Sequence, residues 1–172
     1  MRPNDNSSNQ PKGPSIDAFL SVGFRPFYLG AALFAALAMP FWTVAFLGGS
    51  ALPSHLSPYT WHVHEMLFGF APAVMAGFLL TAARNWTGLP TSAGSSLAAL
   101  FTLWLLGRAA PLFCPPAVAA AVDLAFLPVL AGTLAIPLWR ARNTRNLFVI
   151  AVLLVLWVAN ALFHRSLLDA TA

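Results

Sequence analysis

The residues best suited to metal chemistry are the two histidines of the run Trp-His-Val-His-Glu-Met at positions 61–66. On a helix, His62 and Glu65 lie three residues apart and share a face, whereas His64 points about 200° away from His62. We therefore do not expect the two histidines to chelate one ion from a regular helix. One should enter the protein interior while the other faces a neighbouring helix or loop. Glu65 is expected to hold the second ring nitrogen of a ligating histidine and so fix its tautomer.

A third histidine, His164, lies four residues after Asn160, so these two side chains share one helical face. Two histidines from facing helices are what six-coordinate haem iron needs. Imidazole also suits copper, and the sulfur atoms of Met66 and Cys114 are soft enough for Cu(I). The alternative is that the histidines lie among lipid headgroups, bonded to water and loops, which fits His55 best. For Cys114 the alternative is an inert loop thiol.

The elements that position these residues follow from the composition. The chain has 172 residues, of which 59% are hydrophobic and 8% are charged. An average soluble domain carries roughly 25% charged residues, so the composition excludes a soluble enzyme and indicates an integral membrane protein. The net charge of +4 comes from basic residues scattered between apolar runs. They form no basic face that could follow phosphates, which excludes a nucleic-acid partner.

The apolar runs predict an all-α, polytopic transmembrane bundle, because a bilayer core about 30 Å thick needs ~20 apolar residues per helix. Strands are not expected, since the runs do not alternate and exceed the length of a barrel strand. Five spans are expected, over 27–48, 61–81, 96–113, 117–139 and 147–167. Residues 1–15 should form a disordered polar tail, 16–26 an interfacial segment, and 27–168 the bundle.

Basic residues are distributed unevenly between the two sides of the predicted bundle. One side carries Arg2, Lys12, Arg25, Arg84, Arg140, Arg142 and Arg145, and the other carries Arg108 and Arg165. The positive-inside rule then places the N-terminus in the cytoplasm. All four histidines fall toward the opposite, non-cytoplasmic face. The arginines of the 140–146 loop are expected to be solvated and to contact anionic lipid headgroups.

Two charged residues, Arg108 and Asp123, lie within apolar segments. Arg108 is five residues before the end of the third predicted span and Asp123 is six residues into the fourth. Both should therefore lie roughly 8 to 9 Å below the same surface. Charges within a bilayer cost ~2.5 to 3.5 kcal/mol each, so they need partners. We predict an Arg108–Asp123 ion pair, and a double charge swap should then restore the stability that either single swap loses.

The run WHVHEMLFGF at 61–70, together with NWTG at 85–88, resembles the NnrS family. Matching segments continue as FRPFY at 24–28, GFLLTA at 77–82, LWLLGR at 103–108, DLAFLP at 123–128, RN at 142–143 and RNL at 145–147, and then as Asn160 and His164. The resemblance covers nearly everything after residue 20. It implies a multi-pass protein of the bacterial inner membrane that contains haem and copper. It also implies a role in the response to nitric oxide and nitrosative stress, tied to denitrification.

By this resemblance the candidate metal ligands are His62, His64 and His164, and the supporting residues are Glu65, Arg108, Asp123 and Asn160. Nitric oxide is a candidate ligand, and no catalytic residue is assigned. Members of the family resemble considerably longer chains. We therefore expect this chain to be a fragment, or a short form that completes its bundle with a second copy of itself or with a missing C-terminal half.

Two other functions stay open. In a transporter or channel segment, Arg108, Asp123 and Glu65 would line a polar path, but the cytoplasmic halves of the spans are almost purely apolar. A cofactor-free partner subunit is the second alternative. Catalysis also stays open, because no general acid or base stands out beyond Glu65.

Overall fold

The computed structural model describes residues 15–49 and 56–171, and over these residues the chain is helical and contains no strand. Five helical segments are long and apolar enough to cross a membrane. The predicted all-α bundle with five spans is therefore confirmed. Residues 1–14 of the predicted tail and His55 lie outside the described residues. The side of the membrane that the N-terminus faces stays a prediction.

The elements, in chain order, are α1 (Ile16–Phe19), α2 (Phe24–Phe46), α3 (Pro58–His64), η1 (Glu65–Phe70), α4 (Ala71–Thr87), α5 (Gly94–Phe113), α6 (Pro116–Arg140), η2 (Thr144–Asn146) and α7 (Phe148–Thr171). The elements α3, η1 and α4 follow one another without a break and make a single 30-residue span. Residues 24–26, which the sequence places in an interfacial segment, belong to α2.

Local sequence explains several of the helix ends. The side-chain oxygen of Ser57 accepts a hydrogen bond from the Thr60 backbone N–H at 3.1 Å, and Pro58 follows at the first helical position. Both features favour a helix start at this point. Gly88 ends α4 in the left-handed conformation, with φ of 66°, which glycine adopts without a steric penalty. Pro116 opens α6 in the same way as Pro58 opens α3.

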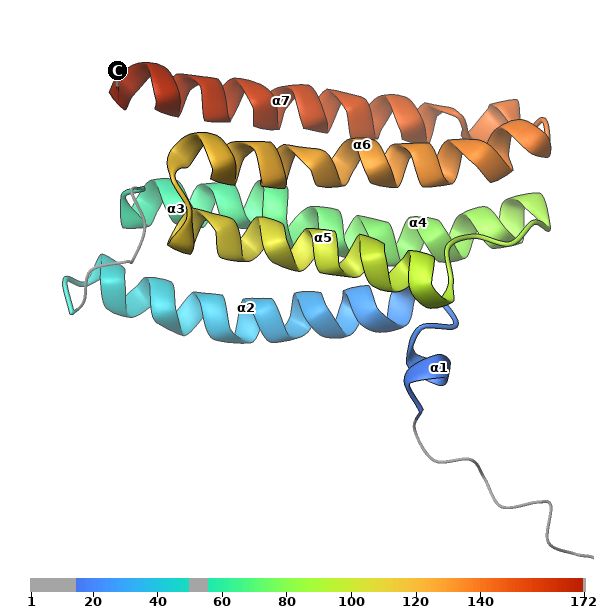
Figure 1. Cartoon of the computed structure of the whole chain (residues 1–172), viewed down its shortest axis with the longest axis horizontal. Coiled ribbons are helices and arrows are strands. Elements are labelled where there is room, and N and C mark those ends of the chain that lie inside the picture. Colours follow the sequence, from blue (N-terminus) through green and yellow to red (C-terminus); the bar gives the residue numbers. More distant parts are fainter. Residues whose placement is uncertain (1–14, 50–55, 172) are drawn as a thin grey trace, which may run out of the picture.

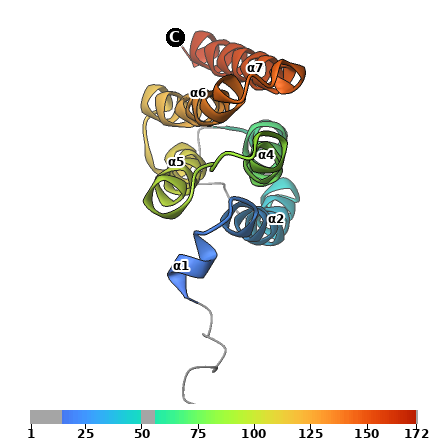
Figure 2. The same ribbon diagram turned by 90° about the vertical axis from the view of Figure 1, so that its right-hand side faces the viewer.

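The five spans run side by side along a common axis (Figure 1). Seen end-on, α2 and α7 lie at opposite ends of the arrangement, with α4, α5 and α6 between them (Figure 2). The main contacts are those of α5 with α6, α6 with α7, and α2 with α4. The core between these helices is apolar, and its largest fully buried side chains include Trp104, Phe27, Leu80, Leu97 and Leu130.

Aromatic packing between α2 and α5 leaves no room for a side chain at Gly30. The ring of Phe27 packs edge-on against Phe101 at 5.5 Å and against Trp104 at 6.4 Å. A Cβ atom at Gly30 would lie 2.6 Å from Phe101 Cε2 and 3.1 Å from Trp104 Cζ3. Gly132 in α6, by contrast, has open space around its Cα. The packing of these α5 aromatic rings against the backbone of α2 therefore depends on the missing side chain at Gly30.

The substitution G30A is expected to lower the free energy of unfolding by about 1–3 kcal/mol, because an added methyl group overpacks a well-filled contact. The matched control G132A removes a helical glycine in open space and should stabilise the protein by up to about 1 kcal/mol. Thermal unfolding of both variants in mild detergent measures the difference. Equal melting temperatures for the two variants would contradict the close contact at Gly30.

Candidate metal centre

Six polar side chains are buried together at the end of the bundle where α5 ends and α6 begins. They are His64, Glu65, Arg108, Asp123, Asn160 and His164, and each is at most 8% exposed. They come from four of the five spans: His64 and Glu65 from the span that contains α3 and η1, Arg108 from α5, Asp123 from α6, and Asn160 and His164 from α7. Polar groups at membrane depth must satisfy one another, because lipid offers no hydrogen bonds. These side chains therefore have to be considered as one network.

Arg108 lies between two carboxylates of this network. Its Nη1 donates a hydrogen bond to Glu65 Oε2 at 2.5 Å, and its Nη2 donates to Asp123 Oδ1. The Arg108–Asp123 ion pair predicted from equal depth is therefore confirmed. The bond to Glu65 was not predicted, because the spacing in the sequence indicates only a histidine as the partner of Glu65. Arg108 thus joins three spans and neutralises one of the two negative charges.

The other oxygen of Asp123 gathers the remaining polar groups. Its Oδ2 accepts a hydrogen bond from Asn160 Nδ2 at 2.7 Å. The Nε2 atom of His164 lies 3.0 Å from the same oxygen, and the Nε2 atom of His64 lies 3.3 Å from it. Asn160 and His164 therefore share an inward face of α7, as their spacing predicts. One carboxylate oxygen holds both histidine rings in place.

His64 has hydrogen-bond acceptors on both sides of its ring. Its Nδ1 lies 3.3 Å from Glu65 Oε1, and its Nε2 lies 3.2 Å from Asn160 Oδ1 as well as near Asp123. A neutral imidazole has only one N–H group. Each of its two nitrogens faces an acceptor, so the second nitrogen needs a cation, either a proton or a metal ion. The contact with Glu65 is the one predicted for the partner of a candidate ligand.

The group His64, Asp123 and His164 has the donor atoms of a metal site. One ligand atom from each residue lies within 4.8 Å of the other two, and all three residues are buried. Two imidazoles and one carboxylate suit copper, iron or zinc. With neutral imidazoles the network holds two carboxylates and one guanidinium. A bound cation would therefore balance its remaining negative charge.

The same residues do not fit a haem. Asp123 Oδ2 lies within 3.3 Å of Nε2 of both histidines, so the same carboxylate oxygen contacts both nitrogens that a haem iron would bind. The ring of His64 is also flanked by Phe68 at 5.5 Å and by Phe163 at 5.1 Å. A porphyrin extends on all sides of its iron, so these two histidines could not bind one haem without displacing the carboxylate. The network can accept a metal ion by itself.

His62 lies apart from this group, although the sequence analysis includes it among the candidate ligands. Its ring stacks on Trp42 of α2 at 4.1 Å, and its Nδ1 is buried without a hydrogen-bond partner among the described residues. Of the two neighbouring histidines, His64 therefore enters the interior and His62 faces a neighbouring helix. Cys114 is a half-buried free thiol at the end of α5 and is not part of the group.

A π-helical turn, η1, which the sequence pattern did not predict, places Glu65 in the network. It spans residues 65–70, and such turns often occur at functional sites. Gly69 within it lies against Arg108, and a Cβ atom there would lie 2.7 Å from Glu65 Oε2. The Gly69 carbonyl accepts a hydrogen bond from Trp104 Nε1 at 2.9 Å. Gly69 is the sequence feature that could have indicated this contact, because only a residue without a side chain leaves room for the guanidinium of Arg108.

Removal of the guanidinium by R108M is expected to cost about 3–5 kcal/mol, because it leaves two buried carboxylates without their cation. The triple variant R108M/E65Q/D123N removes those charges as well and should recover most of the loss. The control R165M breaks an exposed pair with Asp169 and should cost less than about 1 kcal/mol. Thermal unfolding in mild detergent measures all three, and an R108M value as small as the control would contradict the network.

Because Arg108 also pairs with Glu65, we now expect the charge exchange R108D/D123R alone not to restore stability, unlike the expectation from the sequence. It would replace the cation that pairs with Glu65 by a second carboxylate in the same buried network. Adding E65Q to the exchange should relieve that repulsion. An exchange that is as stable as the wild type without E65Q would show that Glu65 is not a partner of residue 108.

Comparison with known proteins supports the resemblance found in the sequence. The family model described as NnrS protein matches residues 18–172, which include every residue of the network. Comparisons with curated proteins and with solved structures gave no match. Because the family model covers most of the chain, this multi-pass membrane protein belongs to the NnrS family.

Proposed function

We propose that this protein binds a transition-metal ion at His64, Asp123 and His164 and acts in the response to nitric oxide in the bacterial inner membrane. The observation that carries the metal site is the convergence of three buried ligand atoms within 4.8 Å. Membership of the NnrS family supports the connection with nitric oxide. Copper is the metal that the resemblance names besides haem, and the donor set suits it.

Each residue of the network would have a separate part in holding the ion. The histidines would bind it through ring nitrogens and Asp123 through Oδ2. Arg108 bonds the opposite oxygen of Asp123 and so fixes the plane of that carboxylate. Glu65 bonds Nδ1 of His64, the nitrogen that faces away from Asp123. Such outer partners orient ligands and raise their affinity for metals.

A bound copper ion supplies a one-electron redox centre that can coordinate a small ligand, and nitric oxide is the ligand proposed here. The protein surroundings would keep bulk water from this centre, because His64 and Glu65 are fully buried. The aromatic rings of Phe68 and Phe163 lie beside His64 and add to this apolar cover. A small uncharged molecule can reach such a site through lipid, whereas an ion cannot do so easily.

The distribution of polar residues favours a site over a transport path. Among the described residues, all six buried polar side chains belong to the one network. Further along the bundle the buried side chains are apolar, as at Leu97, Leu130 and Leu134. A path across the membrane would need polar groups along its whole length. The buried side chains at these positions offer no such polar groups.

Metal binding can be tested on the whole chain, purified in mild detergent and stripped of metal. Titration with Cu(II), followed by desalting and metal analysis, should give about one copper per chain. Removal of a ligand in H164A or D123N should abolish this binding, and the outer-partner variant N160A should weaken it by about 10- to 100-fold. Parallel titrations with Fe(II) and Zn(II) identify the preferred metal.

The matched control is H62A, which removes the neighbouring histidine outside the group and should leave copper binding unchanged. Circular dichroism establishes that each variant is helical. Equal copper content in H164A and the wild type, or no bound metal in a folded wild type, would overturn the proposed site. A reduced-minus-oxidised visible spectrum of the same preparation tests the haem that the resemblance implies.

A further inference from the structure

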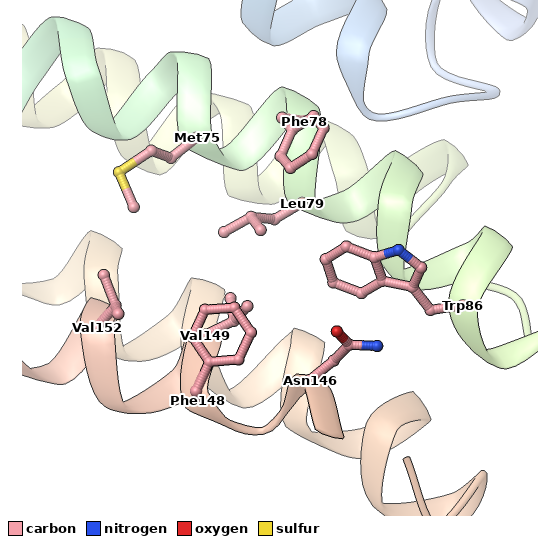
Figure 3. Close-up of a pocket in the computed structure, with 8 residues that line it drawn as sticks. All are labelled: Met75, Phe78, Leu79, Trp86, Asn146, Phe148, Val149 and Val152. Atoms are coloured by element: carbon pink, nitrogen blue, oxygen red, sulfur yellow. The ribbon is translucent and has the colours of Figure 1, made fainter. Parts of the chain in front are cut away.

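A groove of about 330 Å³ lies between α4 and α7, at the opposite end of the bundle from the buried network. Met75, Phe78 and Leu79 of α4 form one wall, and Val149 and Val152 of α7 form the other (Figure 3). The volume is at the lower end of the range for small-molecule sites, about 300–1,000 Å³. The walls are almost wholly apolar, so the occupant must be apolar along most of its length.

One end of this groove carries the two lining residues that have side-chain nitrogen atoms. Trp86, near the end of α4, and Asn146, just before α7, lie together there, and Met75 and Val152 lie at the other end (Figure 3). The side-chain nitrogen of Asn143 donates a hydrogen bond to the Trp86 carbonyl at 3.0 Å. This bond ties the segment before α7 to the end of α4 and fixes the separation of the walls. A polar part of an occupant would lie at this end, beside Asn146.

Positive charge gathers at this same end. Arg84 lies in the last turn of α4, Arg140 ends α6, and Arg142 and Arg145 flank the short helix η2. All four arginines are exposed. Over residues 15–49 and 56–171 none of the four forms an ion pair with a carboxylate. Their charge is therefore available to an anionic group outside the chain.

We propose that this groove binds an anionic phospholipid. One acyl chain would lie between Met75 of α4 and Val152 of α7, and the phosphate would lie beside Asn146 within reach of Arg84 and Arg145. An acyl chain fits because it is apolar, flexible and tethered to a phosphate at one end. A further helix fits less well, since close helix packing in membranes uses small residues. The walls here carry large side chains.

The test uses the full chain in nanodiscs that contain either phosphatidylglycerol or phosphatidylcholine, with native mass spectrometry to count the lipids retained. The wild type should retain phosphatidylglycerol in preference to phosphatidylcholine. The exposed substitutions R84Q and R145Q should each lower retention about fivefold, as expected when one arginine near an anionic headgroup is lost. R165Q, at the opposite end, is the matched control and should leave retention unchanged.

A second pair of variants tests the groove itself. V152W fills it and should lower retention of phosphatidylglycerol about tenfold. V155W puts the same bulk on the same helix at a residue that is 70% exposed and outside the groove, so it should have no effect. Equal retention by V152W and V155W, or equal retention of the two lipids by the wild type, would overturn the proposal. A wild type that is dimeric, together with a V152W variant that is monomeric but retains lipid, would also overturn the proposal and would assign the groove to a second copy.

Discussion

Charge neutralisation around Arg108 governs how three of the five spans meet. The guanidinium bonds one carboxylate from the span containing η1 and one from α6, while it belongs to α5 itself. None of these charges could remain in an apolar bundle alone. The same contacts leave Asp123 Oδ2 and Glu65 Oε1 free to face the histidines. The helix packing and the candidate metal centre therefore rest on one interaction.

The amino-acid sequence predicts the fold well because span length and hydropathy are properties of single segments. It also predicts the Arg108–Asp123 pair, because equal depth on consecutive antiparallel helices depends only on residue counting. The contact of Arg108 with Glu65 could not be found in this way. It depends on a π-helical turn and on the space left at Gly69, which are set by packing between spans.

For the candidate ligands too, residue spacing predicts part of the arrangement and packing between spans decides the rest. Sequence reasoning names His62, His64 and His164, and it expects only one of the first two to enter the interior. It cannot choose between them, because the choice depends on which face of the span turns toward α6 and α7. In the structure, His64 contacts Asp123 in the interior, whereas His62 stacks on Trp42. The resemblance implies haem and copper, and only the second suits the geometry around Asp123.

The π-helical turn also sets the rotational phase between the two halves of its span. A π turn holds one more residue than an α-helical turn of the same height, so it offsets the residues before it from those after it by about 100°. Rewinding this segment as continuous α-helix at its present length would turn His64 away from Asp123 by that angle. Deleting one residue within 66–68 would instead restore the α-helix and leave His64 in phase with α4. The alignment of the histidine with its carboxylate therefore depends on one residue being held outside the regular helical repeat between Glu65 and Gly69.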